Sequence, residues 1–157
     1  MGEMREGHIL LVEDNVDDEA LTLRALRQGG IHNPVHVARN GTDALDRLTG
    51  DPTLKPGTES SQPQFVLLDL QLPEMSGFAV LKGIRAHPQT ASLPVIVLST
   101  SDEPRDIAEC YRLGANSYVL KPVDFKAFVT VIAAMGVYWL VHNKPYPSHH
   151  APREPGV

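Results

Sequence analysis

The sequence predicts an α/β domain built around a parallel sheet of five strands. Short runs of Val, Ile and Leu recur along the chain, and continuous apolar runs are typical of strands covered on both faces. Amphipathic segments separate these runs, so a strand–helix unit is repeated five times, as expected for parallel strands joined by right-handed crossovers. The predicted strands lie at residues 8–12, 35–38, 65–68, 94–98 and 117–120.

The helices are predicted from apolar residues at helical spacing between these strands. In the first helix, Val16, Ala20 and Leu23 share one face. Residues with turn or capping chemistry mark the helix boundaries. These are Gly29-Gly30 after the first helix, Asn40-Gly41 before the second, His87-Pro88 after the third, Gly114 after the fourth, and Asp124 before a last helix that runs to about His142.

Composition and charge indicate one ordinary globular domain. A chain of 157 residues with 42% hydrophobic and 21% charged residues is neither disordered, nor collagen-like, nor a long coiled coil. The net charge of −5 and the lack of a Lys/Arg cluster argue against nucleic acid or an anionic membrane as a direct partner. The longest nearly apolar run, residues 127–141, is shorter than the ~20 residues of a membrane span. Without a signal peptide, we expect a soluble cytoplasmic protein.

Two polar segments lie outside the strand–helix pattern. Residues 51–64 contain three prolines and a Thr/Ser-rich stretch, which predicts an exposed loop. Residues 143–157 contain four prolines and no apolar period, which predicts a frayed or extended tail. We therefore expect a domain over residues 7–142, with an extended last helix, followed by a Pro-rich tail over residues 143–157.

Polar side chains follow four of the predicted strands at the point where each strand ends. Glu13 and Asp14 come after the first strand, Asp69 after the third, Ser99 after the fourth and Lys121 after the fifth. Because ligands of open parallel sheets bind beyond the carboxyl ends of the strands, these side chains should meet at one edge.

This set of side chains has a specific chemical meaning. Three carboxylates in one pocket repel one another and raise their own pKa values. A hard divalent cation such as Mg²⁺, which prefers oxygen ligands, removes that conflict. An ammonium group and a hydroxyl group instead suit the oxygens of a phosphoryl group. A carboxylate can itself accept the phosphoryl group as an acyl phosphate.

The motifs around these residues have the order and spacing of a known family. They are Glu13-Asp14-Asn15, Asp69-x-x-x-Pro73-x-x-x-Gly77, the apolar run that ends at Ser99, and Leu120-Lys121-Pro122. Separations of 30 residues from Asp69 to Ser99 and 22 from Ser99 to Lys121 fit the same pattern. Over about residues 7–135 the chain resembles the receiver domain of two-component response regulators. The resemblance implies a flavodoxin-like, doubly wound, five-stranded parallel sheet in the order 2-1-3-4-5.

The resemblance implies a role for each carboxylate. Asp69 would be the phosphoacceptor. Glu13 and Asp14 would hold Mg²⁺ together with Asp69 and the backbone carbonyl of Gln71. The chain would then be a phosphoacceptor signalling protein that catalyses only its own phosphorylation and dephosphorylation.

The resemblance also implies roles at the ends of the last two strands. Lys121 would contact the phosphoryl group, and the Ser99 hydroxyl would move to it on activation. Tyr118 would be the aromatic switch residue whose rotamer follows that hydroxyl. The Lys121–Pro122 peptide bond would be cis.

Simpler interpretations exist for each motif taken alone. Glu13-Asp14 could be a solvated turn before a helix capped by Asn15. Tyr118 could be an ordinary half-buried strand residue, and Cys110 a packing or surface residue. A metal site at His149-His150 has little support without further ligands.

Two functions compete with phosphotransfer. The first is a receiver-like interaction module that works without phosphorylation; the intact acidic pair, Asp69 and Lys121 argue against it. The second is a small-molecule enzyme on the same fold. No phosphate-cradling or flavin-binding loop supports that enzyme.

The last helix predicts a protein interface. Over residues 123–141 it would be ~28 Å long, whereas a five-residue strand covers only ~17 Å. The overhang would be apolar on every side, and one domain would not bury all of it; the predicted homodimer interface is Val137, Tyr138, Trp139, Leu140 and Val141. A tail that folds back over this surface is the alternative.

The partner is predicted from the same features. The extended aromatic helix, the acidic segment at residues 13–19 and the long loop resemble small response regulators that are paired with phytochrome-type photoreceptor histidine kinases. Only 36 residues follow Lys121, too few for a DNA-binding or catalytic output domain. The expected output is a change in protein–protein binding, produced by phosphorylation.

Overall fold

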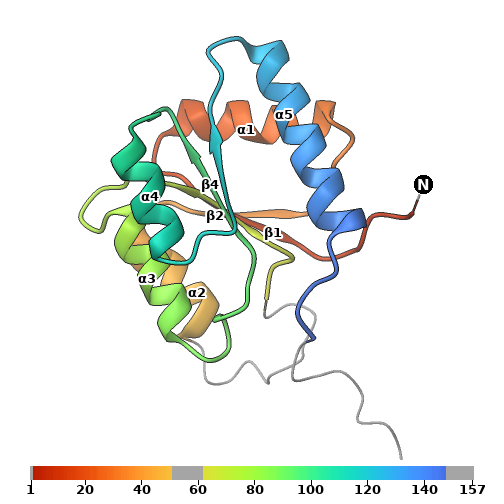
Figure 1. Cartoon of the computed structure of the whole chain (residues 1–157). Coiled ribbons are helices and arrows are strands. Elements are labelled where there is room, and N and C mark those ends of the chain that lie inside the picture. Colours follow the sequence, from red (N-terminus) through yellow and green to blue (C-terminus); the bar gives the residue numbers. More distant parts are fainter. Residues whose placement is uncertain (1, 51–61, 148–157) are drawn as a thin grey trace, which may run out of the picture.

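The protein folds as a five-stranded parallel sheet with helices on both faces, as predicted (Figure 1). The computed structural model describes residues 2–50 and 62–147. The sheet has the order β2-β1-β3-β4-β5, which confirms the predicted doubly wound topology. The strands are β1 (Ile9–Val12), β2 (Val35–Ala38), β3 (Val66–Asp69), β4 (Val95–Ser99) and β5 (Ser117–Leu120).

The helices alternate with the strands along the chain. They are α1 (Val16–Gln28), α2 (Gly41–Thr49), α3 (Gly77–Ala86), α4 (Pro104–Arg112) and α5 (Phe125–Val137), and a π-helical turn, η1 (Tyr138–His142), extends α5. Helices α1 and α5 cover one face of the sheet, while α2, α3 and α4 cover the other (Figure 1).

Side-chain caps start four of the five helices where short polar residues precede an apolar stripe. Asn15, Asn40, Ser76 and Asp124 each accept a hydrogen bond from the backbone N–H three residues further on. Each bond satisfies one of the free N–H groups of the first helical turn. The predicted starts at Asn40 and Asp124 are therefore confirmed.

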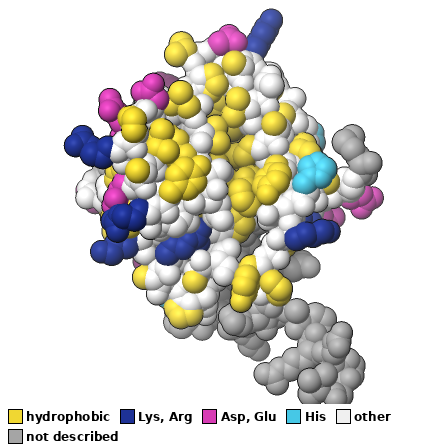
Figure 2. Space-filling view, in the orientation of Figure 1, with side chains coloured by type: hydrophobic (Ala, Val, Ile, Leu, Met, Phe, Trp, Pro, Cys, Tyr) yellow, Lys and Arg dark blue, Asp and Glu magenta, His cyan; other side chains and the backbone are white. Residues whose placement is uncertain are grey.

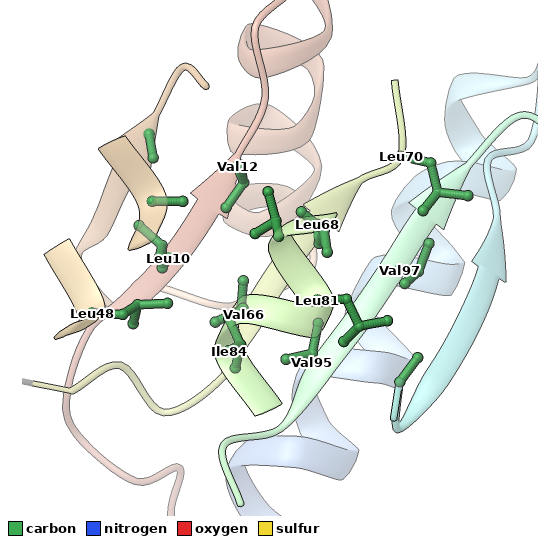
Figure 3. Packing of buried hydrophobic residues seen from close by; sticks show 14 of the residues in the cluster. Leu10, Val12, Leu48, Val66, Leu68, Leu70, Leu81, Ile84, Val95 and Val97 are labelled. Atoms are coloured by element: carbon green, nitrogen blue, oxygen red, sulfur yellow. The ribbon is translucent and has the colours of Figure 1, made fainter. Parts of the chain in front are cut away.

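The alternation of side chains along each strand produces two apolar cores, one on each face. Leu10 and Val12 belong to the core under α2, α3 and α4, whereas Ile9 and Leu11 belong to the core under α1 and α5. Figure 3 shows the first core, in which strand residues such as Val66 and Val95 face Leu81 and Ile84 of α3. Because both faces are covered, the strands are continuous apolar runs.

The apolar overhang predicted for the last helix is partly wrong. Trp139 is only 9% exposed and Leu140 is fully buried, and both belong to the core of the α1/α5 face. The prediction compared the helix with strand length alone and ignored the chain before β1. Met4 packs against this core, and the backbone N–H of Arg5 donates to the Leu140 carbonyl at 3.0 Å. The Arg5 guanidinium also donates to the carbonyls of Trp139 and Asn143.

By length and composition alone, the segment Phe125–His142 is long and apolar enough to cross a membrane, because the helix extends beyond the apolar run at residues 127–141 that the sequence prediction counted. Its mean hydropathy is 1.5, and a third of it is buried in the domain. A helix that packs on a domain core has the same composition. The buried residues Phe128, Ile132 and Met135 provide that core face here.

Several predicted features lie partly or wholly outside the described residues. Residues 51–61 of the predicted loop and residues 148–157 of the predicted tail, including His149-His150, belong to this group. The described end of the loop returns to the sheet, because the backbone N–H of Gln64 donates to the His8 carbonyl at 2.8 Å.

Gly77 has no room for a side chain where α3 begins, and this close approach holds α3 against the end of β3. A Cβ at Gly77 would lie 2.6 Å from the Asp69 carbonyl oxygen and 2.6 Å from the Leu70 Cα. Both are backbone atoms that cannot move aside alone. We expect Gly77→Ala to lower the free energy of unfolding by about 1–3 kcal/mol, measured by urea denaturation.

Gly83→Ala in the same helix is the matched control. A Cβ there meets the flexible methyl end of Leu45 at 2.9 Å, and alanine improves helix propensity by about 1 kcal/mol. Its stability should change much less than that of Gly77→Ala. Equal losses in the two variants would contradict the proposed role of the close approach.

Candidate functional site

Four predicted side chains meet at the carboxyl edge of the sheet. Glu13 directly follows β1, Asp69 ends β3, Ser99 ends β4 and Lys121 directly follows β5. The Lys121 Nζ lies 3.0 Å from Asp69 Oδ2 and 3.4 Å from Glu13 Oε2. Residues separated by 108 positions in the chain therefore form one ion-paired cluster.

Burial and neighbouring charges shift the pKa values of the groups in this cluster. Glu13 is 2% exposed. Its burial, followed by the hydrogen bond and charge repulsion from Asp69, raises the pKa of Glu13 to about 8. Burial alone would lower the pKa of Lys121, but the charges of Asp69, Glu13 and Asp18 outweigh that effect and raise the pKa of Lys121. The site thus favours a protonated lysine and holds more acidic groups than one lysine can neutralise.

Three carboxylates are close enough to hold one cation. Glu13, Asp18 and Asp69 each offer an oxygen within 4.8 Å of the others. This all-oxygen set fits a hard divalent ion such as Mg²⁺ or Mn²⁺. Asp14, a predicted ligand, is exposed and lies outside this group, so its role stays a prediction.

Sequence reasoning missed Asp18. It lies in the first turn of α1, and its backbone N–H donates to the capping Asn15 Oδ1 at 3.0 Å. The available signal was the position of Asp18, one helical turn beyond the acidic pair. Whether that turn faces the sheet edge depends on the angle at which α1 leaves β1.

The loop after β3 is held by the Asp69 carboxylate itself. The backbone N–H of Gln71 donates to Asp69 Oδ1 at 2.8 Å. Since Lys121 binds the other oxygen, Oδ2, the two carboxylate oxygens are distinguished. The Gln71 carbonyl remains a predicted metal ligand.

The two predicted switch residues are joined through Ser101, which sequence reasoning also missed. Ser99 is buried, and its Oγ accepts a hydrogen bond from the Ser101 backbone N–H at 3.1 Å. The half-buried Tyr118 donates its hydroxyl to the Ser101 carbonyl at 2.7 Å. Ser101 Oγ in turn donates to Asp106 Oδ2 in α4 at 2.7 Å. A shift of the Ser99 hydroxyl would therefore change the position of Ser101, which is hydrogen-bonded to Tyr118 and to Asp106 in α4.

Two further expectations concern single residues. The Lys121–Pro122 bond is trans, not cis as the resemblance implied, and the trans isomer is intrinsically favoured by ~0.5–1 kcal/mol. Cys110 is the buried residue of α4 and belongs to the core, in agreement with a packing role.

The raised pKa of Glu13 predicts a pH dependence of stability in the metal-free protein. The pKa of Glu13 is about 8 in the folded protein, whereas its usual value is 4.5. A carboxyl group with a raised pKa in the folded state makes the protein less stable as the pH rises between these two values. Glu13→Gln cannot ionise. Relative to this variant, the wild type should lose about 1–3 kcal/mol of unfolding free energy between pH 5 and pH 8.

The measurement is urea denaturation at both pH values in the presence of a chelator. Glu6→Gln is the control, because Glu6 is exposed and precedes β1, at the opposite end of the strand from Glu13. It should behave as the wild type does. An identical pH dependence in the wild type and Glu13→Gln would show that Glu13 is ionised in the folded protein.

A family model described as the response regulator receiver domain matches residues 9–133. The probable methanogenesis regulatory protein FilR2 from Methanothrix harundinacea is 37% identical over 136 residues, which are 87% of this chain and 85% of that protein. Response regulator Rcp1 from Synechocystis is 32% identical over 132 residues, 84% of this chain and 88% of Rcp1.

This chain is also similar to solved structures of response regulators. The Mn²⁺-bound form of Rcp1 has a TM-score of 0.77 and 30% identity, and the match covers 90% of this chain and 99% of that one. The phosphorylated cyanobacterial phytochrome response regulator RcpA has a TM-score of 0.80 and 30% identity, over 91% of this chain and 100% of that one.

Proposed function

We propose, since this chain belongs to the response regulator receiver domain family, that it is a single-domain response regulator whose Asp69 accepts a phosphoryl group from a sensor histidine kinase. The observation that carries the proposal is the pairing of Asp69 Oδ2 with Lys121 Nζ at 3.0 Å, beside further carboxylates. This arrangement joins a nucleophile, a fixed positive charge and an acidic cation site. The same groups argue against the alternative function, an interaction module that works without phosphorylation.

The chemistry assigns a role to each group. An Asp69 carboxylate oxygen forms a bond to phosphorus while the P–N bond to the kinase imidazole breaks. The released imidazole keeps the electron pair of that bond and takes up a proton. Lys121 stays beside Asp69 and stabilises the phosphoryl oxygens.

Glu13, Asp69 and Asp14, with the Gln71 carbonyl, would hold the Mg²⁺ ion. When bound, the ion supplies positive charge that offsets the charge of the phosphoryl group. The acidic cluster here supports Glu13 and Asp69 as ligands, and the Mn²⁺-bound form of Rcp1 supports a divalent ion. Hydrolysis of the acyl phosphate later returns Asp69 to its original state.

The output we propose is altered protein binding rather than catalysis on another substrate. Phosphorylation adds ~−2 charge at Asp69. The Ser99 hydroxyl then moves to the phosphoryl oxygens, and its bond to the Ser101 N–H changes with it. Since Ser101 also holds Tyr118, this shift favours a different arrangement of the loop before α4.

The kinase we propose is a phytochrome-type photoreceptor kinase such as a bacteriophytochrome, and we propose that this protein works in the cytoplasm. The likeness to RcpA, described as a phytochrome response regulator, supports this partner. The similarity to FilR2, described as a methanogenesis regulatory protein, favours no photoreceptor. The test is to measure phosphotransfer to this protein from a phytochrome-type kinase and from other sensor histidine kinases.

Asp69→Asn should abolish phosphorylation by acetyl phosphate or by a phosphorylated kinase, because the amide is not a nucleophile. The measurement is radiolabel incorporation with Mg²⁺ present, with release of the label by hydroxylamine as the mark of an acyl phosphate. Asp46→Asn, which removes an exposed acid of α2, should be labelled as well as the wild type. Equal labelling of Asp69→Asn would refute the acceptor assignment.

We also propose that the protein forms a homodimer through its last helix. The surface we propose is the outer side of the helix end: Tyr138 is 50% exposed, and Val137 and Val141 are partly exposed. Figure 2 shows hydrophobic side chains gathered on the face of the molecule that carries α5. The buried Trp139 and Leu140 would support this surface from within rather than contact the partner.

Tyr138→Asp should convert the dimer to a monomer of 17.2 kDa in light scattering, because a charge would face the second copy. Tyr138 is the residue to change, since an acid at the buried Trp139 would disrupt the core. Tyr146→Asp, at an exposed tyrosine beyond the helix, is the matched control and should leave the mass unchanged. A monomeric wild type would overturn the proposal.

A further inference from the structure

We infer that residues 2–5 form a strap that closes over the end of the last helix and limits the apolar surface that this end offers to a second copy of the chain. Figure 1 shows this N-terminal segment, in red, beside the end of α5. The strap and the second copy would compete for the same helix end, so opening of the strap strengthens self-association. The inference rests on the proposed homodimer for its partner and adds a contact that regulates it.

The strap lies directly along the π-helical turn η1. The backbone N–H of Arg5 donates to the Leu140 carbonyl at 3.0 Å, and Met4 packs against the core of the α1/α5 face. A Cβ at Gly2 would lie 3.3 Å from Val141 Cγ1, so the Gly2 backbone passes close to that side chain. Since Val141 belongs to the proposed dimer surface, the strap borders this surface and covers part of it.

One side chain holds the strap on the helix end. The Arg5 guanidinium donates to the Trp139 carbonyl and, at 2.9 Å, to the Asn143 carbonyl. The last carbonyls of a helix have no partner within the helix, and an arginine beside them supplies both hydrogen bonds and favourable charge. Among the described residues, Arg5 makes the only side-chain hydrogen bonds between the strap and the helix end. Loss of this side chain should therefore release the strap.

The chain that follows the strap is held independently of the helix end. Asn33 donates from its Nδ2 to the carbonyls of Arg5 and Gly7, at 2.9 Å in each case. Gly7 has a φ of 118°, a conformation that residues with a side chain rarely adopt. Just beyond it, the Ile9 N–H donates to the Pro34 carbonyl at 2.9 Å. The strap can therefore leave the helix end while β1 stays paired with β2.

An aromatic side chain lies beside the proposed dimer surface but does not contribute to it while the strap is closed. Trp139 is 9% exposed, whereas its neighbour Tyr138 is 50% exposed. The two rings are in edge-to-face contact, with 4.9 Å between their centroids. Tryptophan and tyrosine are enriched at the centre of protein interfaces. An accessible Trp139 would therefore enlarge the surface around Tyr138 that a second copy contacts.

The first test measures the exposure of Trp139, the single tryptophan of the chain. We expect Arg5→Ala to shift Trp139 fluorescence to longer wavelength and to increase its quenching by acrylamide. Hydrogen exchange of the amides at residues 140–143 should become about 10-fold faster, while the amides of β1 keep their protection. Unchanged Trp139 fluorescence and unchanged exchange in folded Arg5→Ala would overturn the inference.

Two further variants separate hydrogen bonding from charge. Lys144→Ala removes an exposed positive charge at the same helix end, and among the described residues Lys144 makes no hydrogen bond to the strap. Arg5→Lys keeps the charge, but an ammonium group lacks the planar fork that reaches two carbonyls. Arg5→Lys should open the strap in part, and it replaces Arg5→Ala if that variant does not fold. Lys144→Ala should match the wild type. The opposite order would overturn the inference.

The second test measures self-association of the full chain by sedimentation velocity over a range of protein concentrations. We expect Arg5→Ala to associate about 10-fold more tightly than the wild type, the effect of one added interface residue of the tryptophan type. An open strap with unchanged or weaker self-association would overturn this inference and leave the homodimer proposal intact. A monomeric wild type with a dimeric Arg5→Ala would support the strap and overturn the homodimer proposal. If both were monomeric, both proposals would fail.

Discussion

The ion pair between Lys121 and the Asp69 and Glu13 carboxylates is the interaction on which the site depends. It joins the ends of β1, β3 and β5, and Asp69 is held on its second oxygen by the Gln71 backbone. The pair is nearly buried, so its charges interact in a medium less polar than water. Because one lysine faces several acids, the arrangement favours the arrival of further positive charge. Burial of Glu13 and its nearness to Asp69 raise the pKa of Glu13, and this crowding of acids favours a cation at the edge of the sheet.

The loop before α4 connects this charged site to the surface. Ser101 receives the Tyr118 hydroxyl, donates to Ser99 and binds Asp106, so three elements share one residue. Its backbone groups make two of these bonds, which is why the link does not require a particular side chain for them. Ser101 therefore links the end of β4 to Tyr118 in β5 and to Asp106 in α4.

The residues before β1 pack against the end of the last helix. Trp139 and Leu140 belong to the core of the α1/α5 face, and Met4 packs against the same core. Arg5 donates hydrogen bonds to the carbonyls of Trp139 and Leu140 in the π-helical turn and of Asn143 just after it. The exposed apolar surface at the end of the helix is therefore smaller than predicted and lies around Tyr138.

The sequence by itself determined the five strand–helix units, the caps at Asn40 and Asp124, and the meeting of Glu13, Asp69, Ser99 and Lys121 at one edge. These features depend on local periodicity and on the rule that parallel strands end at the same side of a sheet. Only the tertiary structure placed Asp18 in the carboxylate group, joined Ser99 to Tyr118 through Ser101, and buried Trp139 beneath the N-terminal segment. Each of these depends on the angle of a helix or the path of a loop, which are decided by packing between residues far apart in the chain.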